Sequence, residues 1–506
     1  MVDRSLRRRH FLRSASALGL GAGLGDWARL QTITPATAAA MTVGTEAVQF
    51  RPEIEPVVRW VEQTPRERIL DVTVGHLKHG LPYRDLLAGL FLAGIRNIKP
   101  HPIGFKLHAV LVINSAHMLG QSVSREDRLL PLFWALDAFK NSQAQDIREG
   151  DWTLHKVDEA RLPKPSKAKA EFVRGMEIWD ADAVDSAIVA MVRSSEMGET
   201  MEPIWRYAVR DQWYIGHKAI FAAQSWRTLQ AIGWLHAEPI LRSLAFGLLN
   251  LRDNSRRAAL GPYEANLENA RKIRDGWQIG TLDAAATRSL LQTFRQASAE
   301  GASAEAVALL NSGVAPQSLW DAVVLAACEL MIQDPGNVSL HAMTAVNALH
   351  HIFGVSVDDT TRKLALLQAV GWLPLYRGRP KSPAGPVIDA MEPAQPTAEG
   401  DAALGEIFDS ISINRAQAAS KVIGYLEKGG SSDLLFAAAR RMILRKCRDN
   451  HDFKYSVAAC EECVLASDAR WQAPLIAATM FKFPGTRSPD SPLMTRAQAA
   501  VKTILG

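Results

Sequence analysis

Apolar residues recur at steps of three and four along most of this 506-residue chain, and this spacing restricts the possible folds more than any other feature. It gathers apolar side chains on one face of an α-helix. The alternation of apolar and polar residues that indicates a half-buried strand is almost absent, and glycine and proline fall between the apolar runs, where helices end. We therefore expect an all-α protein built as a multi-helical array. The clearest predicted helices cover residues 86–95, 105–119, 219–232, 239–249, 284–294, 319–332, 342–353, 364–370, 434–444 and 473–481.

Composition and charge exclude several classes of protein. The chain is 47% hydrophobic and 22% charged, which is ordinary for a large folded core. No stretch of about 18 uninterrupted apolar residues is present, so we expect no membrane span once the N-terminal segment is removed. Six arginines and two aspartates within residues 1–40 supply four of the five net positive charges. Because the rest of the chain has no basic cluster, we do not expect it to bind nucleic acid.

The N-terminus resembles a twin-arginine export signal. Arg8 and Arg9 match the arginine pair, and a phenylalanine, a leucine and an arginine follow at the expected positions of the segment 7–13. A weakly apolar stretch and the alanines at 38–40 come next and suit a cleavage site. We interpret residues 1–40 as a signal peptide and expect a periplasmic or secreted protein; the alternative is a basic arm on a cytosolic protein. Twin-arginine substrates cross the membrane folded, often with a cofactor in place, which favours a bound metal or redox group.

Proline and glycine also indicate how the mature chain is divided. Six prolines and several glycines fall within residues 374–400, where no apolar core can form. We therefore predict a main helical domain over residues 41–373, a Pro/Gly-rich linker over 374–403 and a C-terminal helical unit over 404–506.

One seven-residue pattern occurs twice. Residues 229–235 read LQAIGWL and residues 367–373 read LQAVGWL. A glycine followed by a large apolar residue is typical of a helix C-terminus, so each copy is expected to close an apolar helix. The pair suggests an internal repeat of helical modules, with chance similarity of two helix ends as the alternative.

Histidines are the residues with the clearest potential for chemistry. His217 and His341 lie on predicted helices among small residues that leave room beside the ring, and His451 lies in the segment 450–454. His79 follows His76 at a spacing of three, which places both rings on one helical face. Neutral imidazole is the commonest protein ligand of transition metals.

We therefore predict that His79, His217, His341 and His451 hold a metal ion, with iron or copper preferred. Lys454 and Asp452, close to His451 in sequence, are the candidate catalytic groups for steering protons. The alternative for each histidine alone is an ordinary hydrogen-bonded core or surface residue. His108 and His117 are nine positions apart and fall on opposite faces of one predicted helix, so we do not count them among the predicted metal ligands.

The cysteines leave a second metal reading open. Cys447, His451, Cys460 and Cys463 fall within 17 positions and could bind zinc, and Cys460 could instead form a disulfide with Cys463. Because residues 455–465 are predicted to form one helix, on which only Cys460 and Cys463 share a face, we favour simple packing. The chain has no G-x-S-x-G elbow, P-loop or H-E-x-x-H motif, and no C-x-x-C-H motif for covalent haem.

Three segments resemble a known family. Residues 217–235 and 341–351 are similar to the histidine-led helices of the questin oxidase-like family, and residues 450–455 resemble a late motif of bacterial relatives associated with Rieske-linked proteins. The resemblance implies an oxidase that inserts oxygen, in Baeyer–Villiger fashion, into an aromatic or polyketide-like carbonyl compound. It points to His217, His341 and His451, and less directly to His79. Two features differ: NADPH-dependent members are cytosolic, and the paired C-x-H and C-x-x-H motifs of a Rieske centre are absent here.

Together these features predict an oxidoreductase that acts on a small organic molecule at a histidine-bound metal, with a redox partner protein as electron donor. Non-covalent haem between two histidines is a further possibility for the cofactor. The alternative function is a non-enzymatic helical-repeat scaffold or binding protein of the periplasm.

Overall fold

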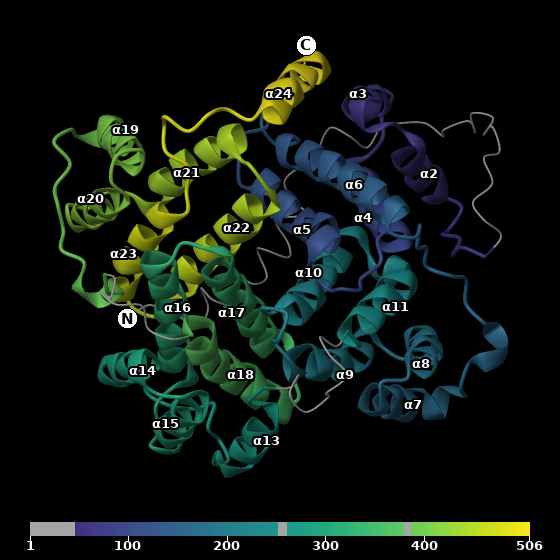
Figure 1. Cartoon of the computed structure of the whole chain (residues 1–506), viewed down its shortest axis with the longest axis horizontal. Helices are drawn as coiled ribbons and strands as arrows, with labels where there is room; N and C mark the ends of the chain where they lie inside the picture. Colours follow the sequence, from purple (N-terminus) through teal and green to yellow (C-terminus); the bar gives the residue numbers. More distant parts are fainter. Residues whose placement is uncertain (1–45, 251–260, 379–385, 506) are drawn as a thin grey trace.

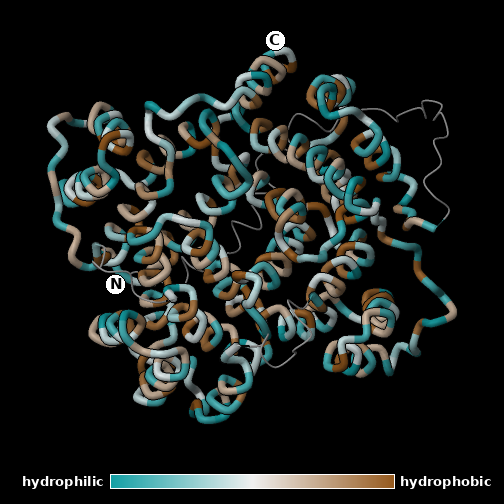
Figure 2. The backbone as a smooth tube through the Cα atoms, viewed as in Figure 1, coloured by the Kyte–Doolittle hydropathy of each residue, from teal (hydrophilic) through white to brown (hydrophobic). Residues whose placement is uncertain are grey.

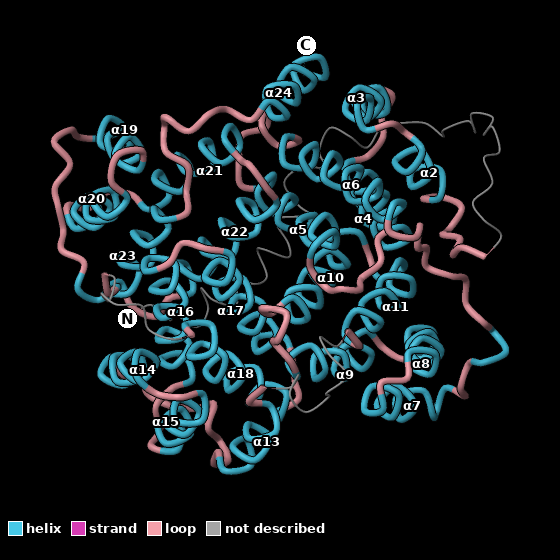
Figure 3. Tube along the Cα trace, viewed as in Figure 1, coloured by secondary structure: helices cyan, strands magenta, loops and turns pink. Residues whose placement is uncertain are grey.

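The computed structural model describes residues 46–250, 261–378 and 386–505. The predicted signal peptide, residues 1–40, lies outside them. Within these ranges the expected all-α, multi-helical fold is confirmed: there is no strand, and the only β-type pairs are two isolated bridges (Figure 3). Among the same residues, no helix has both the length and the apolar character needed to cross a lipid bilayer.

The helices follow one another through short loops. In chain order they are α2 (Glu55–Gln63), α3 (Ile69–Lys78), α4 (Tyr83–Asn97), α5 (His108–Gln121), α6 (Leu130–Arg148), α7 (Pro165–Ile178), α8 (Ala181–Ser194), α9 (Met197–Arg210), α10 (His217–Ile232), α11 (Ala237–Leu248), α13 (Tyr263–Lys272), α14 (Ala284–Gln296), α15 (Ala299–Asn311), α16 (Pro316–Gln333), α17 (Asn337–Val355), α18 (Asp359–Arg377), α19 (Gly400–Ile411), α20 (Arg415–Glu427), α21 (Ser432–Lys446), α22 (Asn450–Leu465), α23 (Ala469–Ala478) and α24 (Pro492–Leu505).

Four helices form the centre of the molecule. Helix α5 packs against α10, α10 against α17, α17 against α22, and α22 against α5, which closes a ring (Figure 1). Helix α17 is buried without interruption from Ser339 to Leu349, as expected of a helix covered on all sides. The other helices surround this ring, and the loops at the periphery are largely hydrophilic (Figure 2).

The chain travels around the ring in sequence order. Helices α4 and α6 lie beside α5, with α2 against α4, and helices α9 and α11 lie beside α10, with α8 against α11. Helices α16 and α18 flank α17, and α21 and α23 flank α22. The last helix, α24, then packs against α3 and α6 near the start of the described chain. Because of this closure, residues far apart in sequence meet at the centre.

The predicted linker and C-terminal unit are closely integrated with the rest. Helix α18 continues through Pro374 to Arg377, so the first part of the predicted linker is helical. Further on, the backbone N–H of Ile388 donates to buried Glu329 of α16, and α22 completes the central ring. The segment after the linker thus shares its core with α5, α16 and α17.

The two copies of the repeated pattern end up in different settings. The first ends α10 at Ile232, and Gly233 follows with φ 110°, as a helix-ending glycine should. The second lies inside α18, where Gly371 provides a close approach: an added Cβ would lie 3.1 Å from Pro262. The expectation that both copies close a helix is wrong for the second copy. There the glycine allows close packing against Pro262, and the helix continues to Arg377.

Candidate metal centre

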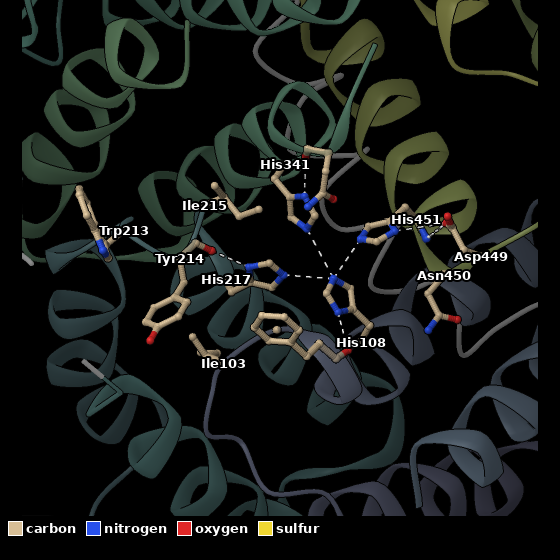
Figure 4. A pocket seen from close by; sticks show the side chains of 13 residues that line it. Ile103, His108, Trp213, Tyr214, Ile215, His217, His341, Asp449, Asn450 and His451 are labelled. Carbon is tan, nitrogen blue, oxygen red and sulfur yellow. Dashed lines mark hydrogen bonds and ion pairs between the residues drawn. The ribbon is translucent and has the colours of Figure 1, made fainter. Parts of the chain in front are cut away.

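Four histidine rings meet at the centre of the helix ring (Figure 4). The Nε2 atom of His108 lies 3.1 Å from that of His217, 3.0 Å from that of His451 and 3.5 Å from that of His341. Ligand atoms of His108, His217 and His341 all lie within 4.8 Å of one another. The rings of His341 and His451 are also close, with centroids 4.9 Å apart. We call these four residues the histidine cluster.

Each histidine stands near the start of one helix of the central ring. His108 and His217 are the first residues of α5 and α10, His451 is the second residue of α22, and His341 lies in the second turn of α17. Since the four helices pack around a common axis region, their N-terminal ends bring the rings together.

The second nitrogen of each ring has a partner that can only accept a hydrogen bond. Nδ1 lies 2.7 Å from the Phe105 carbonyl oxygen in His108, 2.5 Å from that of Tyr214 in His217, and 2.7 Å from that of Asn337 in His341. In His451, Nδ1 lies 3.2 Å from a carboxylate oxygen of Asp449. A carbonyl or carboxylate oxygen requires a donor, so Nδ1 carries the hydrogen and the Nε2 of a neutral ring presents a lone pair.

The surroundings keep at least three of the rings neutral. Burial, with the nearby charge of Lys454, lowers the pKa of His217 to about 3. The same two causes lower the pKa of His108 and of His341 well below the ordinary value. Neutral rings are the form that binds metal ions.

The inward-facing lone pairs of His108, His217 and His341 fit a bound cation, and the Nε2 of His451 lies against that of His108. Two neutral Nε2 atoms without hydrogens repel each other at 3.0–3.5 Å, so these contacts are not hydrogen bonds in the neutral state. Metal–nitrogen bonds of about 2.0–2.1 Å place neighbouring ligand atoms roughly 2.9 Å apart at right angles and roughly 3.4 Å apart in a tetrahedron. Of the three spacings from His108, two fall in that range and the third, 3.5 Å to His341, lies just above it. The acceptors on Nδ1 are the supporting contacts that metal-binding histidines usually have.

A pocket of about 610 Å³ opens beside the cluster. Two short loops form its apolar side, and the starts of α17 and α22 form its polar side. Besides the four histidines, the lining residues are Ile103, Gly104, Phe105, Trp213, Tyr214, Ile215, Asn337, Asp449 and Asn450 (Figure 4).

Backbone strain is concentrated in the two loops. Phe105 and Ile215 both have φ 47°, in the left-handed region that a β-branched residue such as Ile215 rarely adopts. Each loop supplies a carbonyl that holds a ring, Phe105 for His108 and Tyr214 for His217. Strain of this kind persists where the surrounding structure enforces it and is common at functional sites.

Of the four predicted ligands, the structure brings His217, His341 and His451 together and leaves His79 elsewhere. His79 follows the last residue of α3, where its exposed Nδ1 bonds the Gly75 carbonyl. His76 lies in the last turn of α3 and stacks on Trp60, so the expected pair of ligands on one helical face does not form.

Sequence reasoning missed His108, the residue with the most contacts in the cluster. The spacing of nine residues puts His108 and His117 on opposite sides of α5, which argued against a shared site. A single histidine facing the centre is enough, and His108 is that residue (Figure 4). A usable signal was present: His108, like His217, begins an apolar helix shortly after a glycine, Gly104 in one case and Gly216 in the other.

The two predicted catalytic groups differ in their positions. Lys454 is 1% exposed, its Nζ has no hydrogen-bond partner among the described atoms, and its charge acts on three of the clustered rings. Asp452 belongs to the capping box of α22 and pairs with Lys482, 2.7 Å away. The carboxylate that lines the pocket is Asp449.

The cysteines take no part in the cluster. All four are free, and burial raises the thiol pKa of Cys328, Cys447, Cys460 and Cys463. Within the described part of the chain, no cysteine joins a group of three or more close metal-ligating side chains.

Comparisons of this chain with models of known protein families, with curated proteins and with solved structures find no match.

Proposed function

We propose that the protein is a metal-dependent oxidoreductase that binds one transition-metal ion through His108, His217, His341 and His451. A single observation carries the proposal: the Nε2 lone pairs of His108, His217 and His341 converge, that of His451 lies against His108, and each ring is oriented by an acceptor on Nδ1. Buried acceptor nitrogens that face one another destabilise the folded protein unless a cation lies between them.

The donor set and the pocket favour iron or copper. An all-imidazole set suits iron, copper, nickel and zinc. Structural zinc sites are closed, whereas this cluster borders a pocket of about 610 Å³. Bound iron or copper would supply electron transfer at a position that a second molecule can reach.

The pocket supports a small organic substrate. Its apolar side suits an aromatic or carbonyl compound. The resemblance to the questin oxidase-like family, carried by residues 217–235, 341–351 and 450–455, favours a Baeyer–Villiger type oxygenation. Lys454, whose pKa burial lowers to about 7, can take up or release a proton at neutral pH. The twin-arginine-like N-terminus supports a periplasmic or secreted location, where a redox partner protein would deliver electrons.

Elemental analysis and an absorption spectrum of the full-length protein, purified from its native host, test the proposal. We expect iron or copper close to one ion per chain. Substituting His108→Ala, His217→Ala or His341→Ala should remove most of it. The matched control is His79→Ala, an exposed histidine outside the cluster, which should retain all of the metal.

Folded protein without metal, which also fails to take up iron or copper when these are added, would overturn the proposal. Equal metal loss in the His79→Ala control would show that the ion binds elsewhere.

A further inference from the structure

Each of the two strained loops beside the histidine cluster has its ends tied together by a buried aspartate. The first loop covers residues 99–107. The backbone N–H of Lys99 donates to Oδ1 of Asp146 at 2.9 Å, and Nζ of Lys106 lies 2.6 Å from the same oxygen. The other carboxylate oxygen accepts from the Trp152 N–H at 2.9 Å. Asp146 lies on α6 and is 1% exposed, so one buried carboxylate joins two positions of the loop that are seven residues apart.

The second loop, residues 211–216, is closed in the same way. Asp211 follows the last residue of α9, and Lys218 is the second residue of α10. The Lys218 amine forms an ion pair with Oδ2 of Asp211, and Oδ1 of the same carboxylate accepts from the Trp213 N–H at 2.8 Å. The side chains of the pair are 1% and 2% exposed. A carboxylate therefore again bridges two positions seven residues apart, here the end of one helix and the start of the next.

Between its two anchored ends, each loop delivers a hydrogen-bond acceptor to one clustered histidine. The Phe105 carbonyl, one residue before Lys106, accepts from Nδ1 of His108 at 2.7 Å. The Tyr214 carbonyl, in the second loop, accepts from Nδ1 of His217 at 2.5 Å. A ring held through Nδ1 has a fixed tautomer and a fixed direction for its Nε2 lone pair. The position of each loop therefore determines where that lone pair points.

The stability of the fold does not explain why these ion pairs are buried. Desolvation of two charges offsets most of their attraction, so apolar side chains of similar volume often stabilise a protein as well or better. A buried pair does fix the segments that it joins, because separating the partners leaves each charge without a counter-ion. The two pairs occupy corresponding places, each beside one ring of the histidine cluster, and this common position indicates a role in the geometry of the cluster.

We propose that Asp146 with Lys106, and Asp211 with Lys218, are positioning residues of the metal centre. They hold the two loops so that the rings attached to these loops present their Nε2 atoms to a common ion. The inference rests on the proposed function for the presence of an ion, whereas the orientation of the rings by the loops does not depend on metal. Neutralising a pair should leave the fold intact while the lone pair of the attached ring loses its fixed direction.

Copper(II) titration of the full-length protein, followed by absorption and electron paramagnetic resonance spectra, tests the proposal. The first variant combines Asp211→Asn with Lys218→Met, which removes both charges at nearly constant volume and keeps an oxygen for the Trp213 N–H. We expect its copper affinity to be at least tenfold weaker and its spectrum to differ from that of the unmodified protein. Lys106→Met, which leaves Asp146 with its two backbone donors, should act in the same way through the first loop.

The matched control combines Arg295→Met with Glu329→Gln, which removes a largely buried ion pair of α14 and α16 outside the pocket lining. A merely structural role would lower the thermal midpoint of the control and of the loop variants alike. We expect the control to keep the copper affinity and spectrum of the unmodified protein. Equal weakening of copper binding in the control, or unchanged affinity and spectrum in both loop variants, would overturn the proposal.

Nitrogen-15 spectra of histidine-labelled, metal-free protein separate this proposal from the proposed function. The unmodified protein should hold His217 in the single tautomer with hydrogen on Nδ1, and the variant with Asp211→Asn and Lys218→Met should show a mixture of tautomers. If the unmodified protein binds no copper but the tautomers change in this way, the proposed function fails and the role of the loops stands. If copper binds and neither tautomer nor affinity changes, the proposed function stands and the role of the loops fails.

Discussion

His108 holds the cluster together at the cost of stability in the metal-free protein. Its Nε2 lies 3.0–3.5 Å from three other acceptor nitrogens. Replacing it by leucine removes these repulsive contacts. We expect His108→Leu to raise the free energy of unfolding of chelator-treated protein by roughly 1 kcal/mol, the usual trade-off at a functional site. Urea denaturation measures this.

With added metal, the unmodified protein should be more stable than the His108→Leu variant, because only the unmodified protein gains binding energy from the ion. His79→Leu, at an exposed site, serves as the control. It should leave the free energy of unfolding unchanged both in chelator and with added metal. A His108→Leu variant that is less stable than the unmodified protein in chelator would contradict the prediction.

Ile215 is a second residue at the site whose conformation lowers the stability of the protein. A β-branched side chain at φ 47° costs about 1 kcal/mol or more. We expect Ile215→Gly to leave the thermal midpoint unchanged or higher, although an apolar side chain is lost. Ile413→Gly is the comparison: this exposed isoleucine has no positive φ, so glycine only adds chain entropy and should lower the midpoint. A lower midpoint for Ile215→Gly than for Ile413→Gly would contradict the argument.

Part of the residue-level assignment could be obtained from sequence. Small neighbours on predicted helices pointed to His217 and His341, and the family resemblance added His451, because these features are local in the sequence. The inclusion of His79 and the omission of His108 came from judging pairs on one helix, which says nothing about which face meets the other helices. That choice depends on the ring of α5, α10, α17 and α22, and it involves packing between distant segments.

At the scale of elements, the contact between α10 and α17 positions two of the clustered histidines. Gly216 precedes His217 with φ 84°, and an added Cβ would lie 2.2 Å from the Cβ of Ala345 on α17. Gly216→Ala should push the two helices apart and separate His217 from His341. We expect a loss of about 2–3 kcal/mol in the free energy of unfolding and at least a tenfold weaker metal affinity.

Gly198→Ala is the matched control for that substitution. Gly198 lies within α9, has no atom within 4 Å of an added Cβ, and has no positive φ. Alanine there should stabilise the helix by roughly 0.5–1 kcal/mol. Thermal melts and metal titration of both variants make the comparison, and similar effects of the two substitutions would refute the packing argument.

The apolar periodicity predicts most of the helices, but it locates their ends less accurately. The start of α8 is marked in the sequence by Asp180, whose side chain accepts a hydrogen bond from the Ala183 N–H. In contrast, the pattern at 367–373 contains the same glycine signal as 229–235, yet α18 runs through it. The difference lies in Pro262, just before α13, and Ser303 of α15, which leave little room for a side chain at Gly371 and cannot be inferred from the local sequence.

At the scale of the whole molecule, buried histidines should make the protein sensitive to mild acid. Burial lowers the pKa of His101, His117 and His236 to about 4, and the clustered rings are lowered as well. The unfolded chain, with a histidine pKa of about 6.5, binds more protons between these values. Stability is therefore complete above about pH 6.5 and lost as the pH falls through 4.

We expect each of these histidines to contribute on the order of 1 kcal/mol to that loss. Thermal midpoints of chelator-treated protein from pH 7 to pH 4 measure the slope. His117→Gln should flatten it, whereas His79→Gln, at an exposed position, should not. A midpoint that is constant from pH 6.5 to pH 4.5 would contradict the prediction.

The separation of the clustered histidines along the chain has a consequence for biosynthesis. His108 and His217 are 109 positions apart, and His108 and His451 are 343 apart. A ribosome-bound or truncated chain that ends before α22 has three of the four rings and an open side where the fourth helix belongs. Full ion occupancy would then report that synthesis and assembly of the whole ring are finished, so that incomplete molecules could be told apart from finished ones by the metal they lack.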